Sequence, residues 1–229
     1  MPFTIHQFMK YGLALHTSSP ALGLAISNHA DDLRCQTWDL GRETSNYLHP
    51  YLLDFISPQS WQDLGWIAVA SGPGGFTGTR LALVTARTLG QQLDLPVFTI
   101  SSLAAIAWQL FQSVPTGSIE IPAGNSVAIA MPAQRGEVFG AVYQLSQDRQ
   151  ELTTILADTV FAAAEWDLEL ARLNPSDCHT IPQSANLADT VMGVLALAQI
   201  AYDRGERPDW SLALPFYGQH PVINSVIAK

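Results

Sequence analysis

The sequence predicts an α/β protein. Its first half opens with three short apolar segments separated by turns and then alternates helical and strand-like segments. A stretch rich in Pro, Gly and Ser follows, and further strand-like segments come after it. These observations predict two lobes, an N-terminal one over residues 1–112 and a smaller C-terminal one over 113–229.

Three strands open the first lobe. Residues 11–16 are an apolar run that ends at Thr17–Ser18, and residues 23–27 form a second apolar run after a turn. Residues 33–38 alternate apolar and polar side chains, as in a half-buried strand. Three strands with such short connections form an antiparallel meander.

Helices and strands then alternate. Helices are predicted over 43–56, 77–93 and 103–111, where apolar residues recur at helical spacing, and buried strands over 66–70 and 96–100. Pro50 predicts that the first helix either kinks or begins at that residue. The first lobe therefore has the order β-β-β-α-β-α-β-α.

The second lobe repeats the meander. A loop is predicted over 113–126, and strands over 126–131, 137–145 and 152–160. Asn186 is suited to cap a helix over about 186–204 that Gly205 ends. We expect this helix to pack back on the first lobe. The sequence contains no internal repeat of about 20–50 residues.

The charge balance argues against tight nucleic-acid binding. The chain has 20 acidic and 11 basic residues, a net charge of −9, and Lys10 and Lys229 are its only lysines. Phosphate binding needs clustered Lys and Arg. Charged residues make up 14% of the chain, against about 25% in an ordinary soluble domain. Two interpretations are open: an apolar surface that a partner covers, or a neutral polar surface.

The remaining composition fits a cytoplasmic protein. Cys35 and Cys178 are far apart and predict neither a disulfide framework nor a zinc site. Residues 1–10 lack the pattern of a signal peptide. No uninterrupted apolar run reaches the length of about 18 residues that a membrane span needs.

The strongest motif is Ser71-Gly-Pro-Gly-Gly-Phe-Thr-Gly-Thr-Arg80, between a buried strand and a helix. Its glycines allow close backbone approach, and Thr77 is suited to cap the helix. Two interpretations are open, a phosphate cradle at the helix N-terminus or a tight structural turn. The motif matches neither the Gly-x-Gly-x-x-Gly fingerprint nor the P-loop.

The helix after this loop carries a stripe of small residues. Gly78, Ala82, Ala86 and Gly90 recur every four residues and lie on one face. The stripe either packs inside the chain or contacts another subunit. Arg80 and Arg87 project from the other turns and are placed to reach a partner.

These residues resemble the TsaB (YeaZ) family, which acts in tRNA threonylcarbamoyladenosine biosynthesis. The family hallmark, similar to Gly-Pro-Gly-Ser-Phe-Thr-Gly-x-Arg, is matched by Gly72, Pro73, Gly74, Phe76, Thr77, Gly78 and Arg80, with Gly75 as the departure. Other parts of the chain also look like the family, namely Thr17–Ser18 and the segments 81–89, 96–103, 133–139 and 215–217. The resemblance is strong over residues 11–106 and patchy beyond.

The resemblance implies an actin-like ATPase (ASKHA) fold of two ribonuclease H-like lobes. It also implies a non-catalytic scaffold that pairs with the catalytic paralogue TsaD, is joined by the ATPase TsaE, and forms a homodimer when alone. No cofactor is implied for the chain itself, although nucleotide could lie at the partner interface. From helical spacing and the resemblance together we predict an interface formed by Tyr47, Tyr51, Leu52, Phe55, Gly78, Ala82, Ala86, Arg87 and Gly90.

Several residues depart from the family pattern. His16 stands where the family has an acid, and in active members of the superfamily that acid helps to hold magnesium. Pro132, Gln134 and Gly218–Gln219 likewise replace charged residues. His49 has no second histidine four residues away, so the paired-histidine metal site that the resemblance implies for TsaD is absent, and we predict no metal site.

Two alternatives remain at this point. One is a nucleotide-binding ATPase or phosphotransferase of the same fold that uses Gly72–Thr79 for phosphates. The other is a diverged paralogue that keeps the fold without the pathway.

Overall fold

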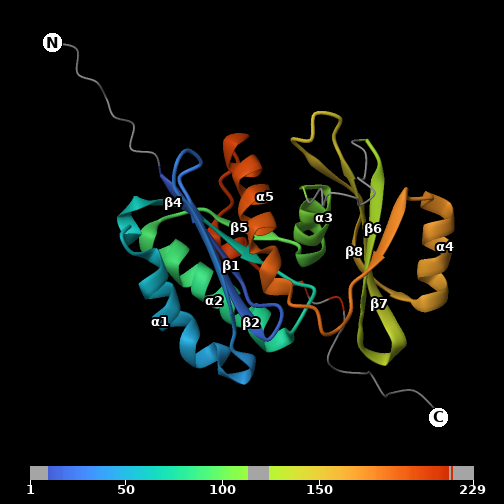
Figure 1. The fold of residues 1–229 in the computed structure, drawn as a ribbon, viewed down its shortest axis with the longest axis horizontal. Helices are drawn as coiled ribbons and strands as arrows, with labels where there is room; N and C mark the ends of the chain where they lie inside the picture. Colours follow the sequence, from blue (N-terminus) through green and yellow to red (C-terminus); the bar gives the residue numbers. More distant parts are fainter. Residues whose placement is uncertain (1–9, 113–123, 217, 219–229) are drawn as a thin grey trace.

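The protein is built of five layers, in which two sheets alternate with three layers of helices (Figure 1). The computed structural model describes residues 10–112, 124–216 and 218. The first half contains β1 (Tyr11–His16), β2 (Ala21–Ser27), β3 (Leu33–Asp39), α1 (Thr44–Ile56), β4 (Leu64–Ala70), α2 (Phe76–Leu93), β5 (Val97–Ile100) and α3 (Ser102–Gln112). The second half contains β6 (Ser126–Pro132), β7 (Glu137–Leu145), β8 (Leu152–Ala162), α4 (Ala163–Leu173), β9 (Asp177–Thr180) and α5 (Val191–Asp203).

The two sheets have related topologies. The first has the order β3-β2-β1-β4-β5, with an antiparallel meander of β1 to β3 and with β4 and β5 parallel to β1. The second has the order β8-β7-β6-β9, again a meander followed by a strand parallel to its first. Each half thus has the strand arrangement of a ribonuclease H-like lobe, as the resemblance implied.

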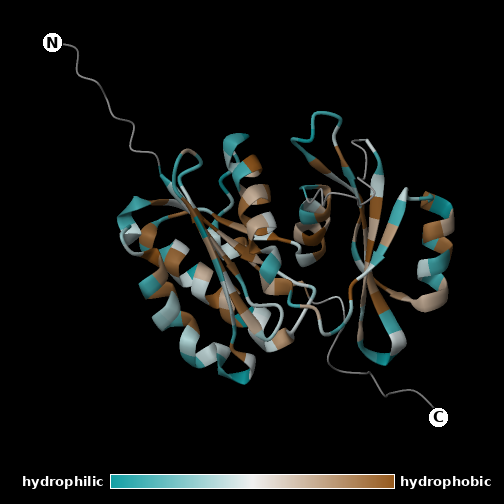
Figure 2. Ribbon diagram, in the orientation of Figure 1, coloured by the Kyte–Doolittle hydropathy of each residue, from teal (hydrophilic) through white to brown (hydrophobic). Residues whose placement is uncertain are grey.

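The two faces of the first sheet are filled by side chains of different size. Leucine, isoleucine and valine side chains on one face pack under α1 and α2. The other face carries Ala14, Ala25, Ala68 and Ala70 together with the large Trp66 and Phe98, and α5 packs against it. Because consecutive strand residues point to opposite faces, the apolar runs in β1 and β4 fill both layers. Figure 2 shows the resulting band of hydrophobic residues in the strands and in α5.

The helices between the sheets are exchanged between the two halves. Helix α3 follows the first sheet in the chain but packs its Leu103, Ile106 and Phe111 against the second sheet. Helix α5 follows the second sheet but packs against the first. The predicted lobe boundary after residue 112 falls beside residues 113–123, which are outside the described part of the chain, as is most of the predicted loop over 113–126.

Three local expectations need correction. Pro50 does not start α1, because the helix runs from Thr44 to Ile56 with Pro50 inside it. Pro50 and Asn46 are both exposed, so water can satisfy the carbonyl that loses its partner. Thr77 does not cap α2, since the cap position is Gly75. Asn186 is a cap, as predicted, but it caps a 3₁₀ turn (Leu187–Thr190) that leads directly into α5.

Two elements were not predicted at all, namely α4 and β9. Helix α4 covers the outer face of the second sheet, with Trp166 packed against Ala128, Ala130 and Val142. Strand β9 pairs in parallel with β6. Within the described residues, no helix is long and apolar enough to cross a membrane.

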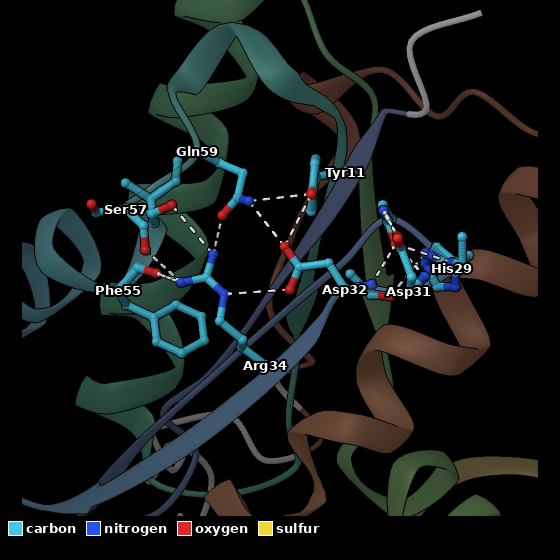
Figure 3. A network of polar contacts seen from close by, with 12 residues as sticks. Tyr11, His29, Asp31, Asp32, Arg34, Phe55, Ser57 and Gln59 are labelled. Atoms are coloured by element: carbon cyan, nitrogen blue, oxygen red, sulfur yellow. Dashed lines mark hydrogen bonds and ion pairs between the residues drawn. The ribbon is translucent and has the colours of Figure 1, made fainter.

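Arg34 in β3 holds the end of α1 in place (Figure 3). Its guanidinium donates hydrogen bonds to the carbonyl oxygens of Phe55 (2.9 Å) and Ser57, and to the side chain of Gln59. Asp32 lies 3.7 Å from the Arg34 Nε and accepts a hydrogen bond from Tyr11. A cation at the C-terminus of a helix also interacts favourably with the helix dipole.

We therefore expect Arg34→Met to lower the free energy of unfolding by about 2 kcal/mol, because hydrogen bonds from a charged donor are lost. Urea unfolding followed by circular dichroism measures this change. Arg42→Met, at an exposed arginine, is the control and should change the stability little. Equal stability of the two variants would show that Arg34 does not hold the helix end.

Candidate functional site

The Gly72–Arg80 motif is fastened to the end of β1 by backbone packing. The Gly75 N–H donates to the Ser18 carbonyl oxygen at 2.6 Å. A Cβ at Gly74 would lie 2.4 Å from that same oxygen, and one at Gly78 would lie 2.0 Å from the Thr17 carbonyl oxygen. Only glycine permits such close contacts, so the structure explains these glycines without a phosphate.

The hydroxyl groups after β1 take part in the same contacts. Thr17 Oγ1 donates to the Gly78 carbonyl oxygen at 2.7 Å, and Thr79 Oγ1 donates to Ser18 Oγ at 3.0 Å. Ser19 Oγ hydrogen-bonds to the Asn186 side chain and accepts from the Ala188 N–H. The end of β1 thereby joins the start of α2 to the 3₁₀ turn before α5.

His16 occupies the position of the expected acid and is completely buried. Its Nδ1 accepts a hydrogen bond from the Ser18 N–H at 3.3 Å, which places the proton of the neutral ring on Nε2. Burial lowers the pKa of His16 to about 3. A neutral, enclosed imidazole is a poor ligand for magnesium, which prefers hard oxygen donors. The residues at this position therefore do not fit a magnesium–nucleotide group.

A cleft of about 570 Å³ lies beside the motif, between the two halves. Gly74, Gly75 and Phe76 line one side, and residues 131–135 and Phe139 line the other. Arg135 is the only charged side chain among the described lining residues, and the lining includes Pro132, where the family often has Asp. Among the described residues, no group of three or more His, Cys, Asp or Glu side chains is arranged to hold a metal ion.

The stripe of small residues on α2 faces the chain's own sheet. Ala82 and Ala86 are completely buried, and a Cβ at Gly90 would lie 2.5 Å from Val97. Leu52 on α1 is also part of the core. Ala82, Ala86, Gly90 and Leu52 therefore pack inside the chain and offer no surface to a partner, contrary to our prediction. Gly78 is half-buried.

The aromatic residues predicted for the interface differ in how far they are exposed. Tyr51 and Phe55 are half-buried and pack on Trp38 of β3, with ring centroids 5.0 and 6.1 Å apart. Tyr47 is exposed, and Arg87 is half-buried. Arg80 stacks over the Phe76 ring at 4.0 Å from its centroid.

The outer surface of α1 and α2 exposes other apolar side chains that the sequence analysis did not select. Leu53 is 60% and Val84 62% exposed. His49 Nε2, one turn before Leu53, lies 3.4 Å from Thr85 Oγ1, which follows Val84 in the sequence, so α1 and α2 are in contact near these two residues. Leu53 and Val84 lie away from the buried faces of their helices, so the helical spacing of the sequence could have identified them as exposed.

Residues 57–188 match the family described as "TsaD: tRNA N6-adenosine threonylcarbamoyltransferase". This match spans more than half of the 229 residues, and the chain therefore belongs to that family. Several curated relatives are named "tRNA threonylcarbamoyladenosine biosynthesis protein TsaB". The Bacillus subtilis protein is 26% identical over 86% of this chain and 82% of its own length. The Escherichia coli protein is 29% identical over 59% of this chain and 56% of its own length.

Solved structures agree with this assignment. The structure described as "YeaZ from Pseudomonas aeruginosa" has a TM-score of 0.69 and 25% identity, and the match covers 91% of this chain and all of that one. A second structure from that organism, described as similar to peptidase YEAZ, has a TM-score of 0.71. The resemblance to the TsaB (YeaZ) family and the predicted fold are confirmed.

Burial of the stripe gives a test. We expect Ala82→Arg to unfold the protein, because a charged side chain cannot be accommodated in a completely buried site. Circular dichroism and light scattering distinguish an unfolded chain from a folded monomer. Thr88→Arg, on the exposed side of the same helix, should fold normally. A folded Ala82→Arg protein would contradict the observed packing.

The buried histidine predicts a pH dependence. In the unfolded chain His16 binds a proton below about pH 6.5, whereas in the folded chain it stays neutral down to about pH 3. The free energy of unfolding should therefore fall as the pH is lowered, by about 2 kcal/mol between pH 7 and pH 5 from this group alone. Urea unfolding at several pH values measures it, and His16→Asn should lose that part of the slope. Parallel pH profiles of the two proteins would contradict a neutral buried histidine.

Proposed function

We propose that this chain takes part in the formation of N6-threonylcarbamoyladenosine in tRNA as a non-catalytic subunit that binds a TsaD-like paralogue. The family match and the TsaB relatives support the pathway. The observation that carries the non-catalytic role is His16, which is buried, neutral and hydrogen-bonded at the position where active members use an acid. The subunit supplies a binding surface and needs no metal or nucleotide of its own.

The proposed surface is the outer face of α1 and α2, with Leu53 and Val84 as its apolar anchors. Large apolar side chains that are more than half exposed on adjacent helices favour association, because a partner removes them from water. Figure 1 places both helices in an outer layer, where a partner has access. In the absence of the paralogue the same face would pair with a second copy, since a self-complementary patch generates a two-fold dimer. A TsaE-like ATPase would join the heterodimer.

The alternative of an ATPase or phosphotransferase has less support. The hydroxyl groups of Thr17, Ser18 and Ser19 are engaged within the chain, and Gly74 packs on the Ser18 carbonyl. These contacts give the loop a structural role at the start of α2.

We expect the double substitution Leu53→Glu and Val84→Glu to weaken binding to the TsaD-like protein of the same organism about 100-fold or more. Two buried apolar side chains contribute about 3 kcal/mol together. Light scattering of each protein alone and of the mixture measures the change: the unsubstituted chain should convert from a homodimer to a one-to-one heterodimer.

Leu168→Glu on α4 is the matched control, because Leu168 is 71% exposed and α4 lies on the opposite side of the molecule from α1 and α2 (Figure 1). It should bind the paralogue normally. The threonylcarbamoyladenosine content of tRNA in cells depleted of the chain should be restored by Leu168→Glu and not by the double variant. A chain that ignores the paralogue, or cells that keep the modified nucleoside after depletion, would overturn the proposed function.

A further inference from the structure

A second groove, of about 450 Å³, lies between the two sheets. Its walls come from the end of β5 and the start of α3, from β7 and β8, and from Leu197 of α5. Its polar lining includes Ser101, Tyr143 and Asp158, together with the hydroxyl groups of Ser71, Thr99 and Thr154. Ile100, Leu152 and Leu197 contribute apolar surface. Ser71, which precedes the glycines of the motif, also lines this groove, whereas none of the residues Gly72–Arg80 does.

A chain of hydrogen bonds runs along the groove. Ser101 Oγ accepts from the N–H groups of Leu103 and Ala104, so it caps α3. Tyr143 donates its hydroxyl hydrogen to Asp158 Oδ1 at 2.6 Å, and Ser101 Oγ lies 3.2 Å from the tyrosine oxygen. The tyrosine hydrogen is committed to Asp158, and the Ser101 hydroxyl lies between the tyrosine oxygen and the carboxylate, where its hydrogen bond opposes the rise in the pKa of Asp158 that burial causes. The chain ends at the carboxylate.

Asp158 has no cationic partner. Among the described residues, no Lys, Arg or His forms an ion pair with it or lowers its pKa by charge. Burial raises the pKa of Asp158, and burial together with that carboxylate raises the pKa of Tyr143 well above its usual value. Asp158 is half-buried, and hydrogen bonds from Tyr143 and Ser101 offset part of the effect of burial. It still has no counter-ion among the described residues, and a cation that enters the groove would supply one.

We propose that the groove binds a primary ammonium group carried on a short aliphatic chain, with the Asp158 carboxylate as its counter-ion. The ammonium donates to the Asp158 oxygen that Tyr143 does not use, and Ser101 and Tyr143 fix the orientation of the carboxylate. The methylene groups lie against Ile100, Leu152 and Leu197. This inference is independent of the proposed function.

The arrangement favours an ammonium over other cations. A guanidinium is best bound by two free carboxylate oxygens, and Tyr143 already occupies Oδ1. Magnesium or calcium needs several oxygen ligands, whereas Asp158 is the only carboxylate among the lining residues. An ammonium needs one carboxylate oxygen and a few further acceptors, and Thr99 and Thr154 in the lining supply hydroxyl oxygens.

The test is the melting temperature of the full chain in n-butylammonium chloride, with tetramethylammonium chloride at equal concentration as the reference. We expect a rise of about 2–4 °C at about five times the dissociation constant. Methylammonium should need an about tenfold or higher concentration for the same rise, because it lacks the methylene groups. Tetramethylammonium has no N–H donor and should give no rise. Equal rises in butylammonium and tetramethylammonium would overturn the proposal.

Asp158→Asn should abolish the rise, because asparagine keeps the size and the acceptor for Tyr143 but removes the charge. Asp167→Asn, at an exposed position in α4, is the matched control and should keep it. A rise that persists in Asp158→Asn would overturn the proposal.

Amide chemical shifts of the unsubstituted chain provide a measurement that needs no variant. Butylammonium should perturb the amides of Ser101, Leu103, Ala104 and residues 154–158. Perturbations confined to other parts of the molecule would overturn the proposal.

Discussion

The close contact between the end of β1 and the start of α2 determines much of this structure. The carbonyl oxygens of Thr17 and Ser18 occupy the space that side chains at Gly78 and Gly74 would need. The helix can therefore lie directly against the sheet, with Ala82, Ala86 and Gly90 in contact with it. With its inner face packed so tightly, α2 presents its outer residues in a fixed position beside α1.

The same contact changes the chemistry of the cleft. Hydroxyl groups that follow the first strand are used to hold the loop and the 3₁₀ turn before α5. The strand itself ends in a buried neutral histidine. These residues therefore form structural contacts within the chain. This is consistent with a subunit that works through its surface.

The sequence predicted the first sheet well because its strands are apolar runs between clear turns, as in 66–70. It left the stripe on α2 ambiguous, since small side chains suit a sheet contact and a subunit contact equally, and burial decides between them. Helix α4 had a usable signal in the spacing of Trp166, Leu170 and Leu173. Strand β9 is short and polar, and its pairing with β6 depends on the tertiary structure. Ser101, Tyr143 and Asp158 are far apart in the chain, so no local pattern could bring them together.

The exchange of α3 and α5 between the two halves has a mechanical consequence. Each sheet is covered on its inner face by a helix from the other half of the chain, and the two helices also contact each other. Neither half can separate without exposing the apolar face of both sheets. The molecule is therefore expected to unfold in a single cooperative transition, and a fragment ending near residue 112 would carry an uncovered helix and an uncovered sheet. Interdomain opening of the kind that drives catalysis in hinged enzymes is opposed by the same packing.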